Sequence, residues 1–282
     1  MLSPKNVCRQ KRKMENYYKS NGLYDRLLNL KGAHDFQWVS GNAWLLAYGN
    51  KIDQEARFLA LVSGSSWIPQ EEIIESLKHL AQKIKVPVIQ IVFDDAPEKV
   101  LSSVSVKNLL NEKTKKVSLN DLFEIFKKLK LDVNQGLCGK LINDKASSAY
   151  HKWQRATLGN KIIVSDIDLI RTSVAGPVEI IELKRSTQDI SKWSPYKEDY
   201  LNFSLLKSVS IKAGINFSIS YNKMLKNAST KVVTGEITDF VSIFSFDNNH
   251  CKDTLRNCSF SDFLDGKYRI SVSSAPQWPS KF

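Results

Sequence analysis

Residues 161–185, KIIVSDIDLIRTSVAGPVEIIELKR, constrain the fold of this chain more than any other stretch. Residues 162–170 are mostly apolar, and a second run rich in β-branched residues covers residues 178–184. Between them, the Ala-Gly-Pro sequence of residues 175–177 consists of residue types that favour turns. The stretch therefore predicts two short strands that are joined by a turn and pair with each other.

Charged residues interrupt both apolar runs at positions that strand geometry can bring together. Side chains on a strand alternate between its two faces, so Asp166 and Asp168 are expected on one face of the first strand. By the same rule Glu182 and Lys184 share a face of the second strand. Glu182 lies opposite Asp166 in one register and opposite Asp168 in another, and the sequence leaves both registers open.

The expected meeting of an Asp, a Glu and a Lys has a chemical reason. Carboxylates a few ångströms apart repel each other and are costly to bury without a partner. The positive charge of Mg²⁺ removes that repulsion, and Mg²⁺ suits such a site because it prefers oxygen ligands and keeps several waters. The bound metal can also activate water for attack on a phosphate. A nearby lysine can hold a phosphate oxygen. Asp168 and Glu182 are therefore candidate Mg²⁺ ligands, and Asp166 either supports the site from just outside the metal's ligand shell or is an alternate ligand; we expect Mn²⁺ to substitute.

Asp168, the turn, and then Glu182-Leu183-Lys184 resemble the D-xn-(D/E)-x-K signature of the PD-(D/E)XK nuclease superfamily, and the likeness extends over residues 145–221. That superfamily includes many type II restriction endonucleases, Holliday-junction resolvases and repair nucleases. The resemblance implies a restriction-endonuclease-like core, in which a mixed central sheet is flanked by helices in the order strand, strand, helix, strand. It also implies that Asp168 and Glu182 ligate the metal and that Lys184 is the catalytic lysine.

The chain departs from the family pattern in two places. Ser165 or Ile167 stands where a proline often lies, and the upstream helix lacks the glutamate that some members use as an extra ligand. Asp166 or Asp144 is a candidate for that extra role. The alternative structural interpretation is an ordinary hairpin with a charged outer face, but the strongly apolar surroundings of the acids favour the nuclease.

The balance of charge favours a nucleic-acid partner. The chain has 41 Lys and Arg against 29 Asp and Glu, a formal net charge of +12. Arg185, Lys192 and Lys197 follow the second strand and are candidate contacts to DNA phosphates, although a single surface lysine is more often only solvated. The basic residues 1–20 are a candidate arm along phosphates, with the solvated start of a helix as the alternative.

Composition disfavours several other classes of protein. No apolar run approaches the ~18 residues that a membrane span needs, and no apolar segment follows the basic start as in a secretory signal. The four cysteines are widely spaced and form no C-x-x-C pair, which favours reduced thiols over a zinc site. We therefore expect a cytoplasmic protein without a membrane partner.

The chain as a whole predicts an α/β protein of two domains. Residues 1–135 are expected to form an additional N-terminal α/β domain that recognises DNA or mediates dimerisation, and residues 136–282 the nuclease domain. Expected strands cover residues 36–48, 57–63, 86–93, 100–106, 215–221, 230–246 and 268–272. Expected helices cover residues 69–84, 144–156 and 195–213, and another helix starts at Ser118. Residues 113–116 are expected to form a surface connection before that helix.

Two further features are weighed against the main site. Asp94-Asp95 follows an expected strand and is a rival acidic site, but no lysine-bearing strand comes after it, so a role in capping a loop is favoured. His151 lies on the helix before the candidate site, and a surface position is favoured over an approach to the site.

Together these features predict a Mg²⁺-dependent DNA endonuclease that hydrolyses phosphodiester bonds without a covalent intermediate, with a type II restriction-type enzyme as the first interpretation. Such enzymes usually dimerise on two-fold symmetric sites, so a homodimer is the expected assembly. One alternative is a structure-specific nuclease of repair, recombination or a mobile element. The other is a non-catalytic nucleic-acid-binding module, and RNA stays open as a substrate.

Overall fold

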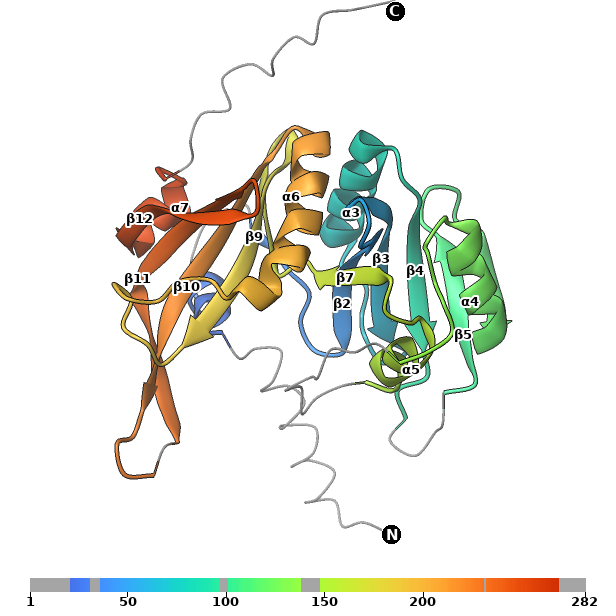
Figure 1. Cartoon of the computed structure of the whole chain (residues 1–282), viewed down its shortest axis with the longest axis horizontal. Coiled ribbons are helices and arrows are strands. Elements are labelled where there is room, and N and C mark those ends of the chain that lie inside the picture. Colours follow the sequence, from blue (N-terminus) through green and yellow to red (C-terminus); the bar gives the residue numbers. More distant parts are fainter. Residues whose placement is uncertain (1–20, 31–35, 97–100, 138–147, 231, 269–282) are drawn as a thin grey trace, which may run out of the picture.

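The structure, a computed structural model, describes residues 21–30, 36–96, 101–137, 148–230 and 232–268. The candidate arm at residues 1–20, Asp144 and most of the expected strand at 268–272 lie outside these ranges. Two six-stranded mixed sheets dominate the described part of the chain (Figure 1). The chain is therefore an α/β protein, as the sequence predicts.

Each sheet takes strands from both halves of the chain. Sheet B has the order β6-β5-β4-β3-β2-β7, and sheet A has the order β1-β8-β9-β10-β11-β12. Sheet B consists of β2 (Ala43–Asn50), β3 (Ala56–Gly64), β4 (Val88–Phe93), β5 (Ser103–Asn108), β6 (Thr114–Ser118) and β7 (Ile162–Asp166). Sheet A consists of β1 (Phe36–Gln37), β8 (Leu169–Ser173), β9 (Gly176–Ser186), β10 (Asn216–Lys226), β11 (Val233–Asp247) and β12 (His250–Ser259). Neighbouring strands are antiparallel except for the parallel pairs β3–β4 and β9–β10.

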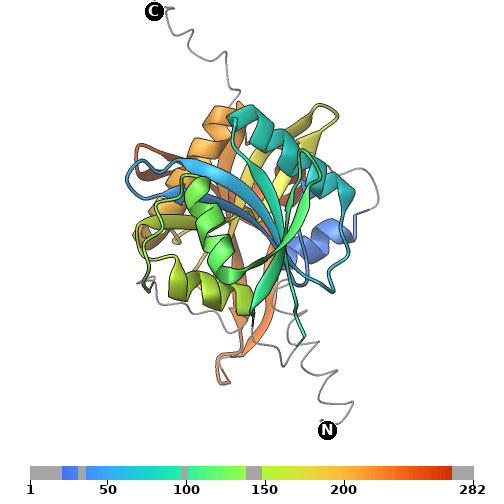
Figure 2. The same cartoon turned by 90° about the vertical axis from the view of Figure 1, so that its right-hand side faces the viewer.

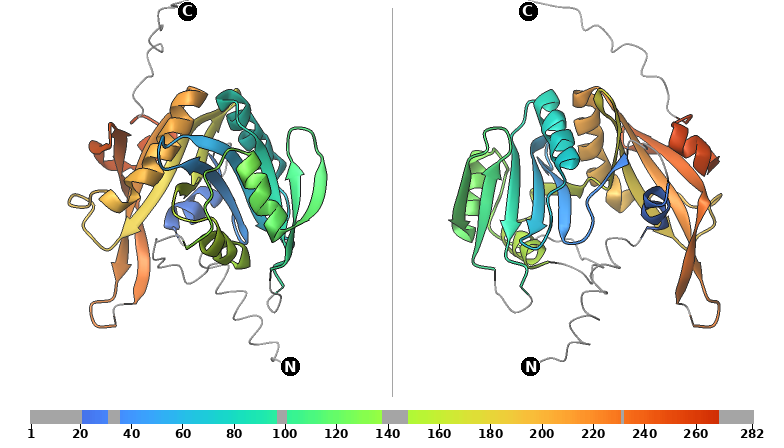
Figure 3. Two further views of the ribbon diagram at one scale, coloured as in Figure 1. Left: turned by 45° about the vertical axis from the view of Figure 1, so that its right-hand side comes forward. Right: turned by 180° about the vertical axis from the view of Figure 1, so that it is seen from behind.

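The described helices form three layers around the sheets. Helices α3 (Glu71–Ile84) and α6 (Tyr200–Ala213) lie between the sheets and share one apolar core with both. Helices α4 (Leu119–Lys128) and α5 (Ala149–Thr157) cover the outer face of sheet B, toward the viewer in Figure 2. Helices α2 (Gly22–Leu28) and α7 (Phe260–Asp265) cover the outer face of sheet A, which the right-hand view of Figure 3 shows. A short 3-10 turn, η1 (Lys197–Asp199), leads into α6.

Strand β2 shows why the sheets are buried on both faces. Its odd-numbered residues, such as Leu45 and Ala47, pack into the central core with α3 and α6. Its even-numbered residues, such as Trp44 and Leu46, pack into the outer core with α4 and α5. Because alternate side chains point to opposite faces, a strand covered on both sides is apolar at nearly every position.

Local sequence signals located several elements correctly. The predicted helix at residues 69–84 is α3, and the predicted helix that ends before Gly214 is α6, whose cap at Gly214 is left-handed with φ 70°. The capping box predicted for Ser118 is present, because Ser118 Oγ accepts from Asp121 N at 3.1 Å and the Asp121 carboxylate accepts from Ser118 N at 3.3 Å.

Two strand predictions were wrong. Residues 162–170 do not form one strand: β7 pairs with β2 in sheet B, and β8 pairs with β9 in sheet A. The expected common face for Asp166 and Asp168 is therefore lost, because Asp166 ends β7 in sheet B and Asp168 immediately precedes β8 in sheet A. Residues 113–116 were expected to be a surface connection, but residues 114–118 form the exposed edge strand β6.

Strand pairing crosses the predicted boundary at residues 135 and 136 in both directions. Strand β1 from the first half pairs with β8, and β7 from the second half pairs with β2. The division into two domains stays a prediction, but the two halves share the central core. Among the described helices, none has the length and apolar character that crossing a bilayer requires.

Candidate active site at the crossover between the sheets

The chain passes from sheet B to sheet A between β7 and β8, and the backbone of this crossover is held from three directions. Ile167 N donates to Leu45 O of β2 at 2.8 Å. The hydroxyl of Tyr24, from α2, donates to Asp168 O at 3.0 Å. Asp168 Oδ2 accepts a hydrogen bond from Leu183 N of β9 at 2.9 Å. Both the backbone and the carboxylate of Asp168 are therefore fixed in place.

The β8–β9 hairpin adopts one of the two registers that the sequence left open. Leu169 pairs with Ile181. One position further along, Asp168 comes beside Glu182, so the register is the one that brings Asp168, rather than Asp166, to Glu182. Asp166 ends β7 and approaches from the other sheet, where it is exposed.

Lys184 is held between two carboxylates on the side of β9 that faces α6. Its Nζ lies 2.9 Å from Glu182 Oε1 and 3.2 Å from Asp199 Oδ2, and 5.4 Å from the centre of the Phe203 ring. Burial lowers the pKa of Lys184, but the charges of Glu182 and Asp199 outweigh that effect and hold the pKa above its ordinary value. Lys184 is therefore a fixed cation.

The two oxygens of the Glu182 carboxylate differ in their surroundings. Glu182 is buried at 6 % exposure, and while Oε1 accepts from Lys184, Oε2 has no hydrogen-bond partner among the described residues. Burial raises the pKa of Asp168, and the charges of Glu182 and Asp166 raise it further. The crossover thus concentrates negative charge that a cation would relieve.

The donor set at the crossover is suited to a hard cation. Asp168 and Glu182 supply only oxygen atoms, which Mg²⁺ prefers over the nitrogen and sulfur ligands typical of zinc. In the part of the chain that the structure describes, no group of three or more His, Cys, Asp or Glu side chains is arranged to enclose a metal ion. Mg²⁺ is commonly held by one or two carboxylates while waters and substrate phosphates complete its shell, so two carboxylates are sufficient.

A cavity of about 290 Å³, called here the crossover cavity, opens beside Asp166 and Asp168. It is lined by side chains from α2, β2, the crossover and β9: Asn21, Tyr24, Val39, Ala43, Trp44, Leu45, Asp166, Ile167, Asp168, Leu183 and Arg185. The cavity therefore places apolar and aromatic surface directly against Asp166 and Asp168.

Two residues of the site were not found by sequence reasoning. Tyr24 contacts the crossover from 144 positions away in the chain, and burial together with the charge of Asp168 raises the pKa of its hydroxyl. Asp199 joins the site because η1 and the start of α6 return to β9. Neither residue belongs to a pattern that points to chemistry, so only the fold reveals them.

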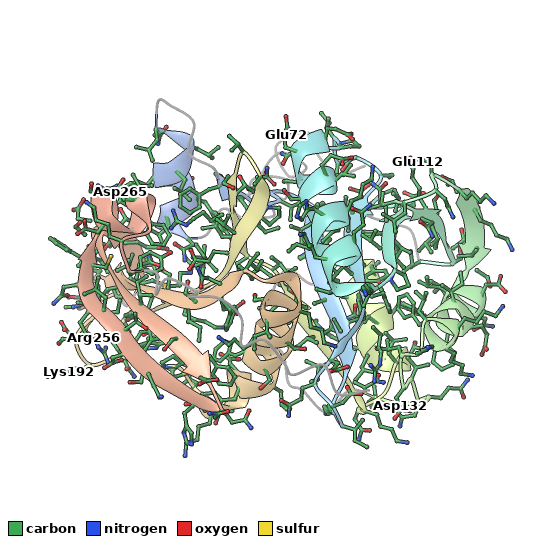
Figure 4. The ribbon with its side chains drawn as sticks, turned by 90° about the horizontal axis from the view of Figure 1, so that it is seen from above. Glu72, Glu112, Asp132, Lys192, Arg256 and Asp265 are labelled. Carbon is green, nitrogen blue, oxygen red and sulfur yellow. The ribbon has the colours of Figure 1, made fainter. Side chains whose placement is uncertain are left out.

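The three candidate DNA-binding residues lie in different surroundings. Arg185 lines the crossover cavity and forms an ion pair with Glu236 of β11. Lys197 is exposed in η1, close in sequence to Asp199. Lys192 is exposed in the loop after β9, beside Arg256 in Figure 4. Of these three residues, Arg185 lines the cavity together with Asp166 and Asp168.

The weaker candidates have structural roles. Asp95 accepts hydrogen bonds from Asn42 Nδ2 at 2.7 Å and Ser65 Oγ at 2.9 Å, which agrees with the predicted loop-capping role. The surface position predicted for His151 was wrong, because this residue is only 6 % exposed. Its ring packs edge-on against the ring of Trp44, with the two ring centroids 4.4 Å apart. Burial follows from α5 covering the outer face of sheet B.

No protein-family model matches this chain, and a search of curated proteins found no match. The case for a function therefore depends on the geometry of the crossover.

Proposed function

We propose that this protein is a Mg²⁺-dependent DNA endonuclease of the PD-(D/E)XK type, with the crossover as its active site. The observation that carries the proposal is the buried Oε2 of Glu182, which has no partner among the described residues and belongs to a carboxylate beside Asp168. A buried carboxylate oxygen without a donor is costly, and a bound cation would satisfy it. The excess of basic residues, +12 in formal charge, supports a polyanionic substrate.

Each residue of the site would have a defined task. Asp168 and Glu182 would hold the metal, and Asp166 would contribute from the edge of sheet B. When bound, Mg²⁺ would supply positive charge at the phosphate and lower the pKa of a bound water. Lys184 would donate a hydrogen bond to a phosphate oxygen and so stabilise the charge that develops as water replaces the leaving oxygen on phosphorus. Hydrolysis would then leave a phosphate on one strand end and a hydroxyl on the other.

Asp199 supports this division of tasks. In the observed arrangement Lys184 contacts both Glu182 and Asp199. If Glu182 turned to a metal ion, Asp199 would still hold the ammonium of Lys184 close to the reacting phosphate. A lysine with a second carboxylate partner is thus kept charged and in place.

A restriction-type enzyme that acts as a homodimer on duplex DNA is the first form of this proposal. A structure-specific nuclease of repair, recombination or a mobile element is the second, and the crossover cavity favours it because one strand enters a narrow cavity more readily than a duplex. The test is to incubate the protein with plasmid DNA, forks, flaps and single strands in the presence of Mg²⁺, Mn²⁺ or EDTA. Discrete plasmid fragments would support the restriction-type enzyme, and cuts at junctions would support the structure-specific nuclease.

Variants separate catalysis from simple binding. Lys184→Ala and Glu182→Ala are expected to abolish cleavage, whereas Lys152→Ala, which removes an exposed lysine from α5, should cut like the wild type. Salt-sensitive DNA binding without cleavage in either metal would support a non-catalytic binding module instead. If Lys184→Ala cuts DNA as fast as the wild type, the crossover is not the active site.

A further inference from the structure

The crossover cavity has walls that suit a flat aromatic ligand. Tyr24 lines the cavity from α2, and its ring stacks on Trp38 with centroids 5.4 Å apart and planes 25° apart. Val39 and Leu45 add apolar surface from the chain leading into β2 and from β2 itself. Aromatic side chains that are held rigid form platforms on which nucleic-acid bases stack with little dependence on sequence.

The same cavity carries a cation that is fixed in position. Arg185 extends from β9 into the lining and pairs with Glu236. Glu236 is itself held by Gly22 N at 2.7 Å and by Asn222 Nδ2 at 2.6 Å. Arginine presents five N–H donors, so one ion pair leaves further donors for a phosphate oxygen.

Beside Arg185, a buried amide oxygen lacks a hydrogen-bond donor among the described residues. Asn222 is fully buried next to Arg185 in the β9–β10 pairing, and its Oδ1 has no hydrogen-bond partner among the described residues. The carboxylates of Asp166 and Asp168 line the same cavity as Arg185. Apolar walls, a fixed cation and the carboxylates of Asp166 and Asp168 therefore line one cavity of about 290 Å³, whereas Glu182 lies outside the lining.

We propose that the crossover cavity holds one unpaired nucleotide of the DNA strand, next to the phosphate that is cut. This inference rests on the proposed function and adds its substrate class. A cavity of this volume, near the lower limit of ligand pockets, can enclose one nucleotide but not a base pair with both backbones. The base stacks against Tyr24, and Arg185 holds a backbone phosphate while the neighbouring phosphate lies at Asp168.

Two sources supply an unpaired nucleotide. A flap, bubble or single strand presents one directly, whereas a duplex must pay the cost of unstacking a base that is flipped out. Both sources place the same chemical group in the cavity. The experiment below distinguishes them by the substrate in which the nucleotide reports binding.

The test measures binding of oligonucleotides that contain 2-aminopurine, a fluorescent base whose emission changes when it stacks. The parent protein is full-length Lys184→Ala in Mg²⁺, so that cleavage does not interfere. Val39→Phe fills the cavity, and Val39→Leu is a milder second variant. The control is Ile68→Phe, which places the same ring at a position that is 81 % exposed and outside the cavity lining.

We expect a fluorescence change on binding a single strand, and affinity about tenfold weaker in Val39→Phe than in the parent. Val39→Leu should weaken binding less, and Ile68→Phe should leave it unchanged. A response in intact duplex identifies a flipped base, and a response limited to flaps, bubbles and single strands identifies one that is already unpaired. A parallel series in RNA reports whether the cavity takes ribonucleotides.

The outcomes separate this inference from the proposed function. If both Val39 variants bind single strands as tightly as the parent and the fluorescence does not respond, the cavity does not hold a nucleotide, even if wild-type protein cuts DNA. If the fluorescence responds and Val39→Phe weakens binding, but wild-type protein cuts no substrate in Mg²⁺ or Mn²⁺, the nucleotide site stands and the nuclease proposal fails.

Discussion

The ammonium of Lys184 lies 2.9 Å from Glu182 Oε1, two positions back on the same strand and the same face. This contact means that the lysine, at Oε1, and a metal ion, at Oε2, would compete for the charge of one carboxylate. Asp199, whose Oδ2 is 3.2 Å from the same ammonium, decides how easily Lys184 gives up Glu182. The metal dependence of cleavage should therefore respond to a residue that is not a metal ligand.

Asp199→Asn is expected to raise the Mg²⁺ concentration needed for half-maximal cleavage about fivefold. Without the second carboxylate, Lys184 depends on Glu182 alone, and a partly buried ion pair of this kind is worth roughly 1 kcal/mol. The measurement is the initial rate of cleavage against Mg²⁺ concentration. Glu198→Gln, which removes an exposed carboxylate from the same turn, is the matched control. An unchanged Mg²⁺ dependence would contradict the competition.

Asp168→Asn is expected to stabilise the metal-free protein at pH 8. Burial and the charges of Glu182 and Asp166 raise the pKa of Asp168 above its ordinary value of 3.8. The folded state then keeps a proton that the unfolded state releases, so stability falls as pH rises above 3.8 toward the raised value. Asparagine removes the charge, while its side-chain oxygen can still accept from Leu183 N.

Urea unfolding in EDTA at pH 4 and pH 8 measures this effect. We expect the variant to gain on the order of 1–2 kcal/mol over the wild type at pH 8 and little at pH 4. Asp132→Asn, at an exposed position, should show no such pH-dependent gain. A variant less stable than the wild type at pH 8 would show that repulsion at the crossover is small.

The fold could be predicted from sequence where the signal was local. The apolar stripe of residues 69–84 and the capping pattern at Ser118 located α3 and α4, because a helix satisfies most of its hydrogen bonds within one segment. The break between β7 and β8 could not be predicted from the sequence. Residues 162–170 are apolar throughout except for a few polar positions, and such a run looks the same whether it forms one strand or two strands in different sheets. The second half pairs with its neighbour β9, but the first half pairs with β2, more than 100 positions earlier in the chain.

The missed elements have a common physical cause. Strands β6 and β12 lie at the outer edges of the two sheets, and most of their side chains are exposed or half-exposed. Polar sequences such as that of residues 114–118 therefore lack the apolar run or clean alternation that predicts a strand. Lysines on β6 also fit an edge strand, since charge there discourages pairing with other chains.

The site was predictable to the extent that its residues are neighbours in the chain. Asp168, Glu182 and Lys184 lie on one hairpin, so strand parity alone predicted that they meet, and pairing then selected the register. Tyr24 and Asp199 reach the crossover through α2 and η1, and no spacing in the sequence connects them to it. Long-range packing of helices onto sheet A supplies that information.

A buried ion pair between Arg171 and Glu179 lies on the face of sheet A that α7 covers, opposite to the face with Lys184. We expect this pair to be needed for the stability of the folded protein. Arg171 Nε donates to Glu179 Oε2 at 3.0 Å, and the Tyr268 hydroxyl donates to the same oxygen at 2.9 Å. Arg171 also donates to Phe263 O at 2.6 Å, which ties α7 to the β8–β9 hairpin. Because Arg171 and Glu179 pair across this hairpin, they help to hold the register that brings Asp168 to Glu182.

Arg171→Met is therefore expected to lower the free energy of unfolding by about 3–5 kcal/mol, because it leaves the charge of Glu179 buried without its counter-ion. Urea titration followed by circular dichroism measures the loss. Lys267→Met, which removes two solvent-exposed ion pairs, with Asp262 and Asp265, at the end of α7, should leave stability unchanged. Equal stabilities for Arg171→Met and the wild type would mean that the pair is not needed to hold the hairpin.

Asp166 and Asp168 are expected to differ sharply as metal ligands. Asp168 is fixed by Leu183 N beside Glu182, whereas Asp166 is exposed at the end of β7. Asp168→Asn should therefore abolish cleavage at every Mg²⁺ concentration, because it removes one of the two carboxylates that would bind the metal directly. Asp166→Asn should still cut, but should need several-fold more Mg²⁺, since it removes only a nearby charge.

Cleavage rates across a Mg²⁺ titration, together with calorimetric titration of Mn²⁺ into each variant, separate these two roles. Asp132→Asn serves as the control for loss of one exposed carboxylate. If Asp166→Asn were inactive and Asp168→Asn retained Mn²⁺ binding, the primary ligand would be the acid on sheet B. The metal would then lie on the β7 side of the crossover, and the assignment of Asp168 and Glu182 as its ligands would be wrong.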